Sequence, residues 1–282
     1  MSHLAEGLLA GKTVLITGGG TGLGLAMGRT FLQLGARLVI TSRREAVLNE
    51  AAETLRRETG GEVTALACDI RSADAVEAMI EAAFRERPID ILVNNAAANF
   101  IAQTEQLSAR AADAILGATL HGALYCTLAA GRRWIEAERP GVVLSILSTS
   151  TITGRAFTTP SAMAKSGVLA MTRSLAVEWG PRNIRLVAIA PGAFPTPGAT
   201  QQLNPASRQG GGGGSRTPLG RTGEHSELAE LAAFMVSDAA AFMTGEMVVL
   251  DGGAHLRTSG AEDLTGWSQA QWEAHRAALA RR

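Results

Sequence analysis

Short apolar segments alternate along this chain with longer segments of helical period, and that alternation constrains the fold more than any other feature. The apolar segments do not alternate strictly between apolar and polar residues, which is typical of parallel strands covered on both faces. They lie at residues 13–17, 37–41, 63–68, 89–95, 142–147, 184–190 and 247–251. The helical segments lie at residues 23–35, 44–59, 72–86, 108–138, 161–179 and 226–237. The sequence therefore predicts an α/β fold, a single Rossmann-type doubly wound parallel seven-stranded sheet with helices on both faces.

The composition suits a globular protein with a large core, because 46% of the residues are hydrophobic and 18% are charged. Basic and acidic residues both total 26, and the resulting zero net charge favours neither a nucleic acid nor an anionic membrane as partner. Cys68 and Cys126 suit a reduced compartment without a disulfide framework. Residues 1–12 are too short and interrupted for a signal peptide, and the apolar runs fall below the roughly 20 residues of a membrane-spanning helix. We expect a cytoplasmic protein with no metal site and no membrane partner.

One segment, residues 192–224, does not fit the alternation, because it is rich in glycine, proline, serine and threonine and contains five consecutive glycines at 210–214. A connection of this length is either a mobile functional loop or disordered. The glycine run is typical of a flexible linker, so both a native and an engineered origin stay open.

No linker divides the chain, and we expect residues 1–255 to form one nucleotide-binding domain that includes the catalytic region. Residues 256–282 would form a C-terminal tail. Ser268 and Gln271 have the spacing of a capping box, which predicts a final short helix from about residue 269.

A glycine-rich turn, TGGGTGLG at residues 17–24, follows the first strand and opens the first helix. Its pattern is T-G-x-x-x-G-x-G, with glycines at 18, 22 and 24, rather than a strict G-x-G-x-x-G. Glycines at this place let backbone amides approach a pyrophosphate at a helix N-terminus. The turn predicts a dinucleotide site that includes Gly18, Thr21, Gly22, Leu23 and Gly24.

The end of the second strand selects the nucleotide. An acidic residue there would hold the ribose 2′-hydroxyl of NAD. This chain instead has Ser42, Arg43 and Arg44, and no acid before Glu45. Because arginines match a 2′-phosphate, the sequence favours NADP(H). The alternative is that both arginines merely lie in solvent at the start of the next helix.

Over residues 8–255 the chain resembles the short-chain dehydrogenase/reductase family. The motifs that carry the resemblance are TGGGTGLG at 17–24, CDI at 68–70, NNAA at 94–97, a serine at 148, Lys165, and PGAFPT at 191–196. Their joint order is highly specific. The alternative for Asp69 and Asn95, that they cap turns at strand ends, does not explain that order.

The resemblance implies a role for each of these motifs in holding the cofactor. Asp69 would contact the adenine amine, Asn95 would lie beside the adenosine, and Lys165 would hold the nicotinamide ribose. Pro191, Gly192 and Thr196 would flank the nicotinamide. Their neighbours in the same motifs complete the expected cofactor site: Ile70, Ala96, Ala97 and Phe194.

The chain departs from the family pattern at catalytic positions. The family tyrosine, four residues before the lysine, corresponds to Ser161, whereas the family serine is retained as Ser148. The family's helix asparagine corresponds to His121. The single tyrosine, Tyr125, lies one helical turn beyond it and is expected to fill a core or interface position.

Within the family the chain is most similar to the 2,4-dienoyl-CoA reductases, over residues 94–108, 160–180 and 190–199. That subgroup also has a serine at the position of Ser161. Its own catalytic tyrosine corresponds to Ser150, and its active-site asparagine again to His121. The resemblance therefore implies a relative that has lost two hydrogen-bond donors to a thioester.

The chemistry that tolerates these losses is reduction of a conjugated thioester, in which hydride adds to carbon and charge collects on the thioester oxygen. The expected function is NADPH-dependent reduction of an activated C=C bond in an acyl-CoA, such as a 2,4-dienoyl-CoA or enoyl-CoA. The alternatives are a nucleotide-binding homologue without hydride transfer, acting as a regulatory or scaffold subunit, and a carbonyl reductase with a rearranged proton relay. The candidate catalytic residues are Lys165, His121, Ser148, Ser150 and Ser161.

The family likeness further implies a homo-tetramer built on the long helices. An acyl-CoA needs cations for its phosphates, and arginines on or near predicted loops could supply them: Arg155, Arg208, Arg216 and Arg221. Loop arginines are also commonly just solvated.

Overall fold

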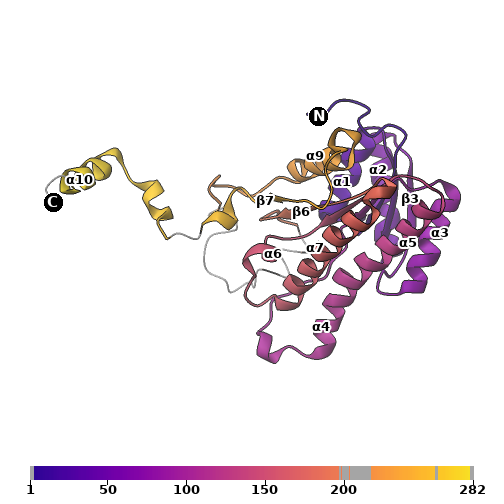
Figure 1. The fold of residues 1–282 in the computed structure, drawn as a ribbon, viewed down its shortest axis with the longest axis horizontal. Coiled ribbons are helices and arrows are strands. Elements are labelled where there is room, and N and C mark those ends of the chain that lie inside the picture. The colour runs from indigo at the N-terminus through magenta and orange to yellow at the C-terminus, as the bar shows by residue number, and fades with distance from the viewer. Residues whose placement is uncertain (1–2, 197, 199–202, 204–216, 258–259, 280–282) are drawn as a thin grey trace.

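The structure is a computed structural model that describes residues 3–196, 198, 203, 217–257 and 260–279. Its strands form one parallel sheet in the order β3-β2-β1-β4-β5-β6-β7 (Figure 1). The strands are β1 (Thr13–Thr17), β2 (Arg37–Ser42), β3 (Val63–Ala67), β4 (Ile91–Asn94), β5 (Gly141–Ile146), β6 (Ile184–Pro191) and β7 (Met247–Leu250). The predicted doubly wound seven-stranded sheet is confirmed.

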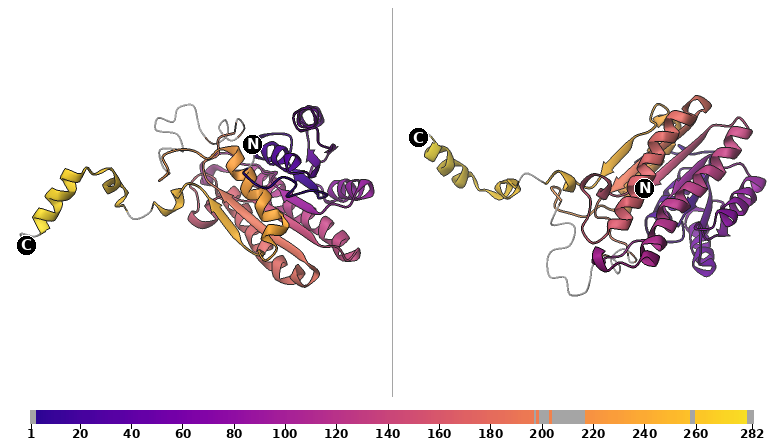
Figure 2. Two further views of the ribbon diagram at one scale, coloured as in Figure 1. Left: turned by 90° about the horizontal axis from the view of Figure 1, so that it is seen from above. Right: turned by 60° about the horizontal axis from the view of Figure 1, so that its bottom comes forward.

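Helices cover both faces of the sheet (Figure 2). One core cluster joins α1 (Gly22–Gln33), α2 (Glu45–Thr59) and α9 (His225–Val236) to the sheet through side chains such as Ile16 and Ile40. A second cluster, on the other face, includes Leu15 and Val39. Its helices are α3 (Ala73–Glu86), α5 (Gly122–Glu136) and α7 (Thr159–Trp179). Because successive strand residues point to opposite faces, uninterrupted apolar runs supply both cores.

Two local features differ from the sequence-based expectation. The single helix expected at 108–138 consists of α4 (Ala109–Leu116), a π-helical turn at Gly117–His121 and then α5. Such π turns are rare and occur often at functional sites. A short helix, α6 (Ser150–Thr153), follows β5 where only a strand exit was expected.

The expectation that every apolar run is strand-sized also needs correction. Among the described residues, the helical run Ala109–Glu136 is long and apolar enough to cross a membrane by length and composition. Its most apolar 18-residue stretch has a mean hydropathy of 1.3. Half of that stretch is buried in this fold, where α5 packs on the sheet and on α3. Packing of a core helix thus accounts for its apolar residues.

The C-terminal tail leads from β7, at the edge of the sheet, to α10 (Gln269–Leu279), which lies apart from the sheet in all views (Figures 1 and 2). The Ser268 amide donates to Gln271 Oε1 at 2.8 Å, and the Gln271 amide donates to Ser268 Oγ at 3.3 Å. Trp267 and Trp272 pack on each other with ring centroids 4.9 Å apart. The glycine run at 210–214 lies outside the described residues.

Candidate active site

The glycine turn between β1 and α1 is packed so closely that two of its positions require glycine. Gly22, the first residue of α1, has φ +54, which favours glycine. A Cβ atom at Gly24 would overlap the carbonyl oxygen of Gly18 and lie 2.6 Å from Asn95 Nδ2. Thr21 caps α1 without a side-chain hydrogen bond. The first amides of α1 therefore keep the arrangement that binds anions at a helix N-terminus.

Asn95 connects the end of β4 to this turn. Its Nδ2 donates to the carbonyl oxygens of Thr17 at 2.9 Å and Gly18 at 3.3 Å. The amides of Asn95 and Ala96 both donate to Thr17 Oγ1, at 3.0 and 3.1 Å. Asn95 thus holds the turn in shape, and Ala97 follows in the same segment. Thr17, which sequence reasoning passed over, is the buried centre of this network.

The ends of β2 and β3 bring cations and one carboxylate together. Ser42 is partly buried, whereas Arg43 and Arg44 are exposed. Asp69 accepts from the Arg71 guanidinium, with Nε–Oδ1 at 2.9 Å and Nη2–Oδ2 at 2.5 Å, and from the Arg71 amide at 3.1 Å. The hydrogen bonds from Arg71 hold the pKa of Asp69 below its ordinary value, and the charge of Arg43 adds to this effect. Arg71 was not singled out from the sequence, although it follows Asp69 by two residues.

Lys165 is buried on α7 and points to the end of β5. Its Nζ donates to the carbonyl oxygen of Ile146, the last residue of β5. Burial lowers the pKa of the Lys165 ammonium group from 10.5 to about 8. Ser161, also buried, precedes it by one helical turn. The site therefore holds a desolvated cation beside a serine hydroxyl.

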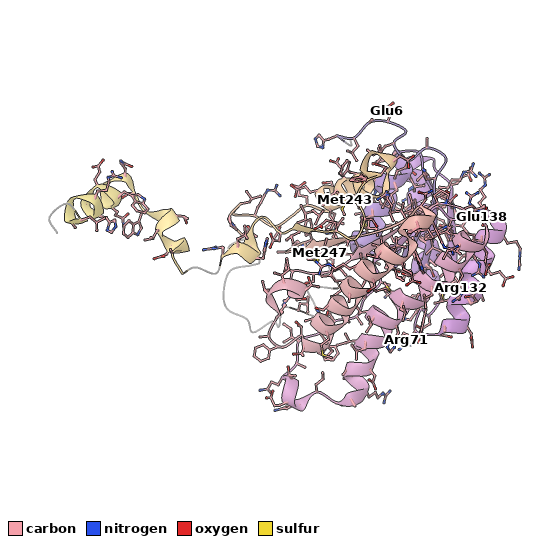
Figure 3. The ribbon with its side chains drawn as sticks, viewed as in Figure 1. Glu6, Arg71, Arg132, Glu138, Met243 and Met247 are labelled. Carbon is pink, nitrogen blue, oxygen red and sulfur yellow. The ribbon has the colours of Figure 1, made fainter. Side chains whose placement is uncertain are left out.

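Ser148 and Ser150 lie on a tight turn after β5. Ser148 Oγ accepts from the Ser150 amide at 3.3 Å, and the Ser148 carbonyl oxygen accepts from the Thr151 amide at 3.1 Å. Thr151 Oγ1 in turn contacts Sδ of Met247, a residue labelled in Figure 3, at 3.5 Å, and this contact joins α6 to β7. The segment thus bends, as placing both serines in one pocket requires. Ser150 is buried and Ser148 is partly buried.

The π turn places its polar residues in contrasting surroundings. His121 is exposed, and its ring lies 6.1 Å from that of Tyr125, which is partly buried against the α3–α5 core. Thr119 is buried, and its hydroxyl accepts from the Ala98 amide at 3.1 Å and donates to the Ala98 carbonyl at 3.3 Å. Thr119 therefore joins the turn to the segment after β4, a contact that sequence reasoning missed.

The segment after β6 reaches back to the glycine turn. Pro191 ends β6, and Gly192 lies against Asp251 at the end of β7. Thr196 lies next to Gly22, since a Cβ atom there would be 3.2 Å from the Thr196 methyl group. The structure thus brings together the motifs at 17–24 and 191–196, which are far apart in the sequence.

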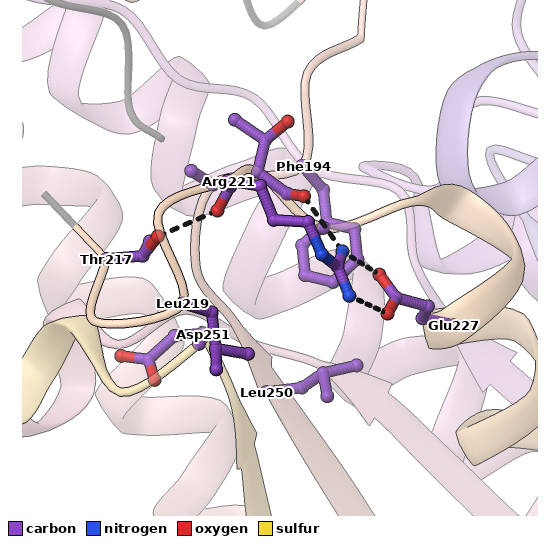
Figure 4. A pocket seen from close by; sticks show the side chains of 11 residues that line it. Phe194, Thr217, Leu219, Arg221, Glu227, Leu250 and Asp251 are labelled. Carbon is purple, nitrogen blue, oxygen red and sulfur yellow. Dashed lines mark hydrogen bonds and ion pairs between the residues drawn. The ribbon is translucent and has the colours of Figure 1, made fainter. Parts of the chain in front are cut away.

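Phe194 lines a cavity of about 60 Å³ between this segment and β7 (Figure 4). Arg221, on the same wall, forms two short ion-pair contacts with Glu227, at 2.8 and 2.6 Å. Its charge is therefore already paired, which disfavours it as a phosphate ligand. Arg208 and Arg216 lie outside the described residues.

Ile70, from the same motif as Asp69, is buried and packs against Gly122 at the start of α5. Its side chain therefore has a packing role in the core.

Comparison with known proteins gives consistent matches. Residues 18–255 match the family model described as enoyl-(acyl carrier protein) reductase. A Caenorhabditis elegans oxidoreductase named as uncharacterized is 40% identical, covering 96% of this chain and 88% of the relative. A Bacillus subtilis (strain 168) protein named "Probable 2,4-dienoyl-CoA reductase" is 38% identical over 87% of this chain and 97% of its own. A solved short-chain dehydrogenase from Bacillus anthracis has a TM-score of 0.78 at 38% identity, covering 88% and 98% of the two chains.

Proposed function

Since the chain belongs to the short-chain dehydrogenase/reductase family of oxidoreductases, we propose that it is an NADPH-dependent reductase of an activated C=C bond in an acyl-CoA thioester. The family implies a nicotinamide cofactor, whose reduced ring supplies a hydride when bound. The choice of NADPH and of an acyl-CoA substrate is the proposal.

The described residues fit a dinucleotide. The close approach of Gly24 to the Gly18 carbonyl leaves no room for a side chain where backbone must meet a pyrophosphate. Arg43 lies within electrostatic reach of Asp69, so the ends of β2 and β3 form one surface for the adenosine half. Exposed Arg43 and Arg44 with partly buried Ser42 would bind a 2′-phosphate, which supports NADPH over NADH.

The observation that supports the proposal is that buried Lys165 has a serine, Ser161, and no tyrosine one helical turn before it. The single tyrosine of the chain, Tyr125, packs against the α3–α5 core beside His121. A carbonyl reductase must protonate an alkoxide oxygen, for which an unactivated serine is a poor acid. Reduction of a conjugated thioester needs only hydrogen-bond donors to the thioester oxygen, because the proton ends on carbon.

Lys165 and nearby serines could supply the donors needed to bind the cofactor and to stabilise the thioester oxygen. With a pKa of about 8, Lys165 is mostly protonated at neutral pH and would donate to oxygen atoms of the ribose as it does to Ile146. Ser150, at the start of α6, and Ser161, one helical turn before Lys165, are buried hydroxyls that could donate to a developing oxyanion. The names of several relatives support the substrate class: proteins from Caenorhabditis elegans and Danio rerio that are 39% and 31% identical are also named as 2,4-dienoyl-CoA reductases.

The test follows NADPH absorbance with panels of 2,4-dienoyl-CoA, enoyl-CoA and ketone substrates, beside a direct titration of NADPH. The proposal expects turnover with a conjugated acyl-CoA and none with ketones. Turnover with ketones alone would instead indicate a carbonyl reductase. NADPH binding without turnover on any panel would refute the proposal. It would instead favour a dinucleotide-binding protein without hydride transfer, in line with the serine, Ser161, at the position of the family tyrosine.

A further inference from the structure

We propose that His225 is a positioning residue that fixes the segment after β6 against the glycine turn and thereby raises affinity for the nicotinamide half of the dinucleotide. The inference rests on the proposed cofactor binding. It concerns a residue outside every motif discussed above, at the start of α9.

The central contact is a hydrogen bond from a side chain to the backbone. His225 Nε2 lies 2.8 Å from the carbonyl oxygen of Pro195, thirty residues earlier in the chain. A carbonyl oxygen only accepts, so Nε2 carries the hydrogen. The neighbouring residue, Thr196, is the one whose methyl group lies next to Gly22. His225 therefore restrains the peptide directly before the contact with the glycine turn.

The anchor of this hydrogen bond is itself fixed relative to the glycine turn. Helix α9 packs along α1 (Figure 1), and Leu228 and Ala232 of α9 share a core cluster with Met27 and Phe31 of α1. Helix α1 begins at Gly22 in the glycine turn and packs against α9, and α9 begins at His225. His225 in turn binds Pro195, next to Thr196. Because packed helices move little against each other, these contacts together fix the distance between Thr196 and the glycine turn.

Two other contacts hold the start of α9 in place. Glu224 and Glu227 form a capping box, and the Glu227 carboxylate also pairs with Arg221 (Figure 4). The Gly223 amide donates to the carbonyl of Ala193 at 3.0 Å. These contacts orient the helix end and the beginning of the segment after β6, whereas His225 restrains the portion that reaches the glycine turn.

The position of Thr196 links this path to the cofactor. A pyrophosphate bound at the N-terminus of α1 would lie beside Gly22, so the segment containing Thr196 would border the bound dinucleotide between its adenosine and nicotinamide halves. A segment already held in place loses less conformational freedom when the ligand binds. Losing His225 should therefore weaken binding of the whole dinucleotide and leave binding of its adenosine half unchanged, since that half would contact the ends of β2 and β3.

The experiment compares His225→Ala, His225→Gln and His3→Ala by calorimetric titration with NADPH, NADH and the fragment 2′,5′-ADP. Glutamine places an amide donor near the position of Nε2. His3 is a matched control, because its Nδ1 lies 3.1 Å from Glu230 Oε2 on the same helix α9 but away from the segment after β6. We expect His225→Ala to raise the Kd for NADPH about tenfold, a typical effect of one lost hydrogen bond, and to leave the Kd for 2′,5′-ADP within about twofold. His225→Gln should recover most of the loss, and His3→Ala should resemble the wild type.

An unchanged Kd for NADPH in His225→Ala, or an equal loss for NADPH and 2′,5′-ADP, would overturn the inference. If the wild type binds neither dinucleotide, the proposed function fails, and hydrogen exchange of the free chain then decides the inference separately. The amides of Ala193, Phe194 and Thr196 should exchange faster in His225→Ala than in His3→Ala. Equal exchange in the two variants would overturn the role of His225.

Discussion

Replacing Lys165 by methionine removes a buried ammonium group while keeping most of the side-chain volume. The folded-state pKa of about 8 lies below the ordinary value of 10.5, so between these values the unfolded chain holds a proton that the folded chain has released. The free energy of unfolding of the wild type therefore rises as the pH increases through this window. From about pH 7 to about pH 9.5 the gain attributable to Lys165 is about 2 kcal/mol, because each pKa unit corresponds to about 1.36 kcal/mol.

The Lys165→Met variant lacks this titration, so its stability should lag behind that of the wild type by about 2 kcal/mol more at about pH 9.5 than at about pH 7. Urea unfolding of both proteins without cofactor, followed by circular dichroism at several pH values, measures the difference. Lys12→Met is a matched control, because Lys12 is the other lysine and pairs with Asp238 at the surface. A wild-type-minus-variant difference that is independent of pH, or equal for the two lysines, would refute the assignment of a desolvated Lys165.

Three further substitutions test the site. Gly24→Ala inserts a methyl group against the Gly18 carbonyl, so NADPH affinity should fall at least about tenfold in the same calorimetric titration; wild-type affinity would show that the turn is not the pyrophosphate site. Thr119→Val leaves the partly buried Ala98 amide without its partner and should lower the free energy of unfolding by about 1–3 kcal/mol, whereas Thr119→Ser should lower it less. His121→Ala should reduce kcat with little effect on NADPH affinity if the ring donates to the thioester, and an unchanged kcat would remove this exposed side chain from the mechanism.

Much of the fold could be predicted because strands buried on both faces are uninterrupted apolar runs in the sequence. The apolar runs at 37–41 and 184–190 locate β2 and β6 to within one residue. The π turn at Gly117–His121 is not marked in this way, because its residues have the same helical pattern with or without the extra backbone residue. Helix α6 also escaped prediction, since its start depends on a hydrogen bond between the Ser150 amide and Ser148 Oγ.

The residues of the candidate site that belong to sequence motifs could be predicted, whereas those whose roles depend on contacts made in the folded chain could not. The glycine turn and Lys165 have fixed spacings that any reader of the sequence can find. Thr17, Arg71 and His225 acquire their roles from partners that only folding brings near: Thr17 binds amides at the end of β4, and His225 binds Pro195. Thr119 and His121 are two residues apart in one predicted helix, but Thr119 is buried and His121 is exposed, a difference that the sequence does not show.

Hydride transfer from NADPH to carbon of a conjugated acyl-CoA is the step on which the proposed function depends. The most direct measurement incubates the enzyme with 2,4-dienoyl-CoA and NADPH that carries deuterium at the transferable position of the nicotinamide, and analyses the product by mass spectrometry. We expect one deuterium bound to carbon in a product with one C=C bond fewer, and a second new hydrogen that comes from solvent. Tight binding of NADPH with no deuterium in any acyl-CoA product, dienoyl or enoyl, would contradict the proposed function.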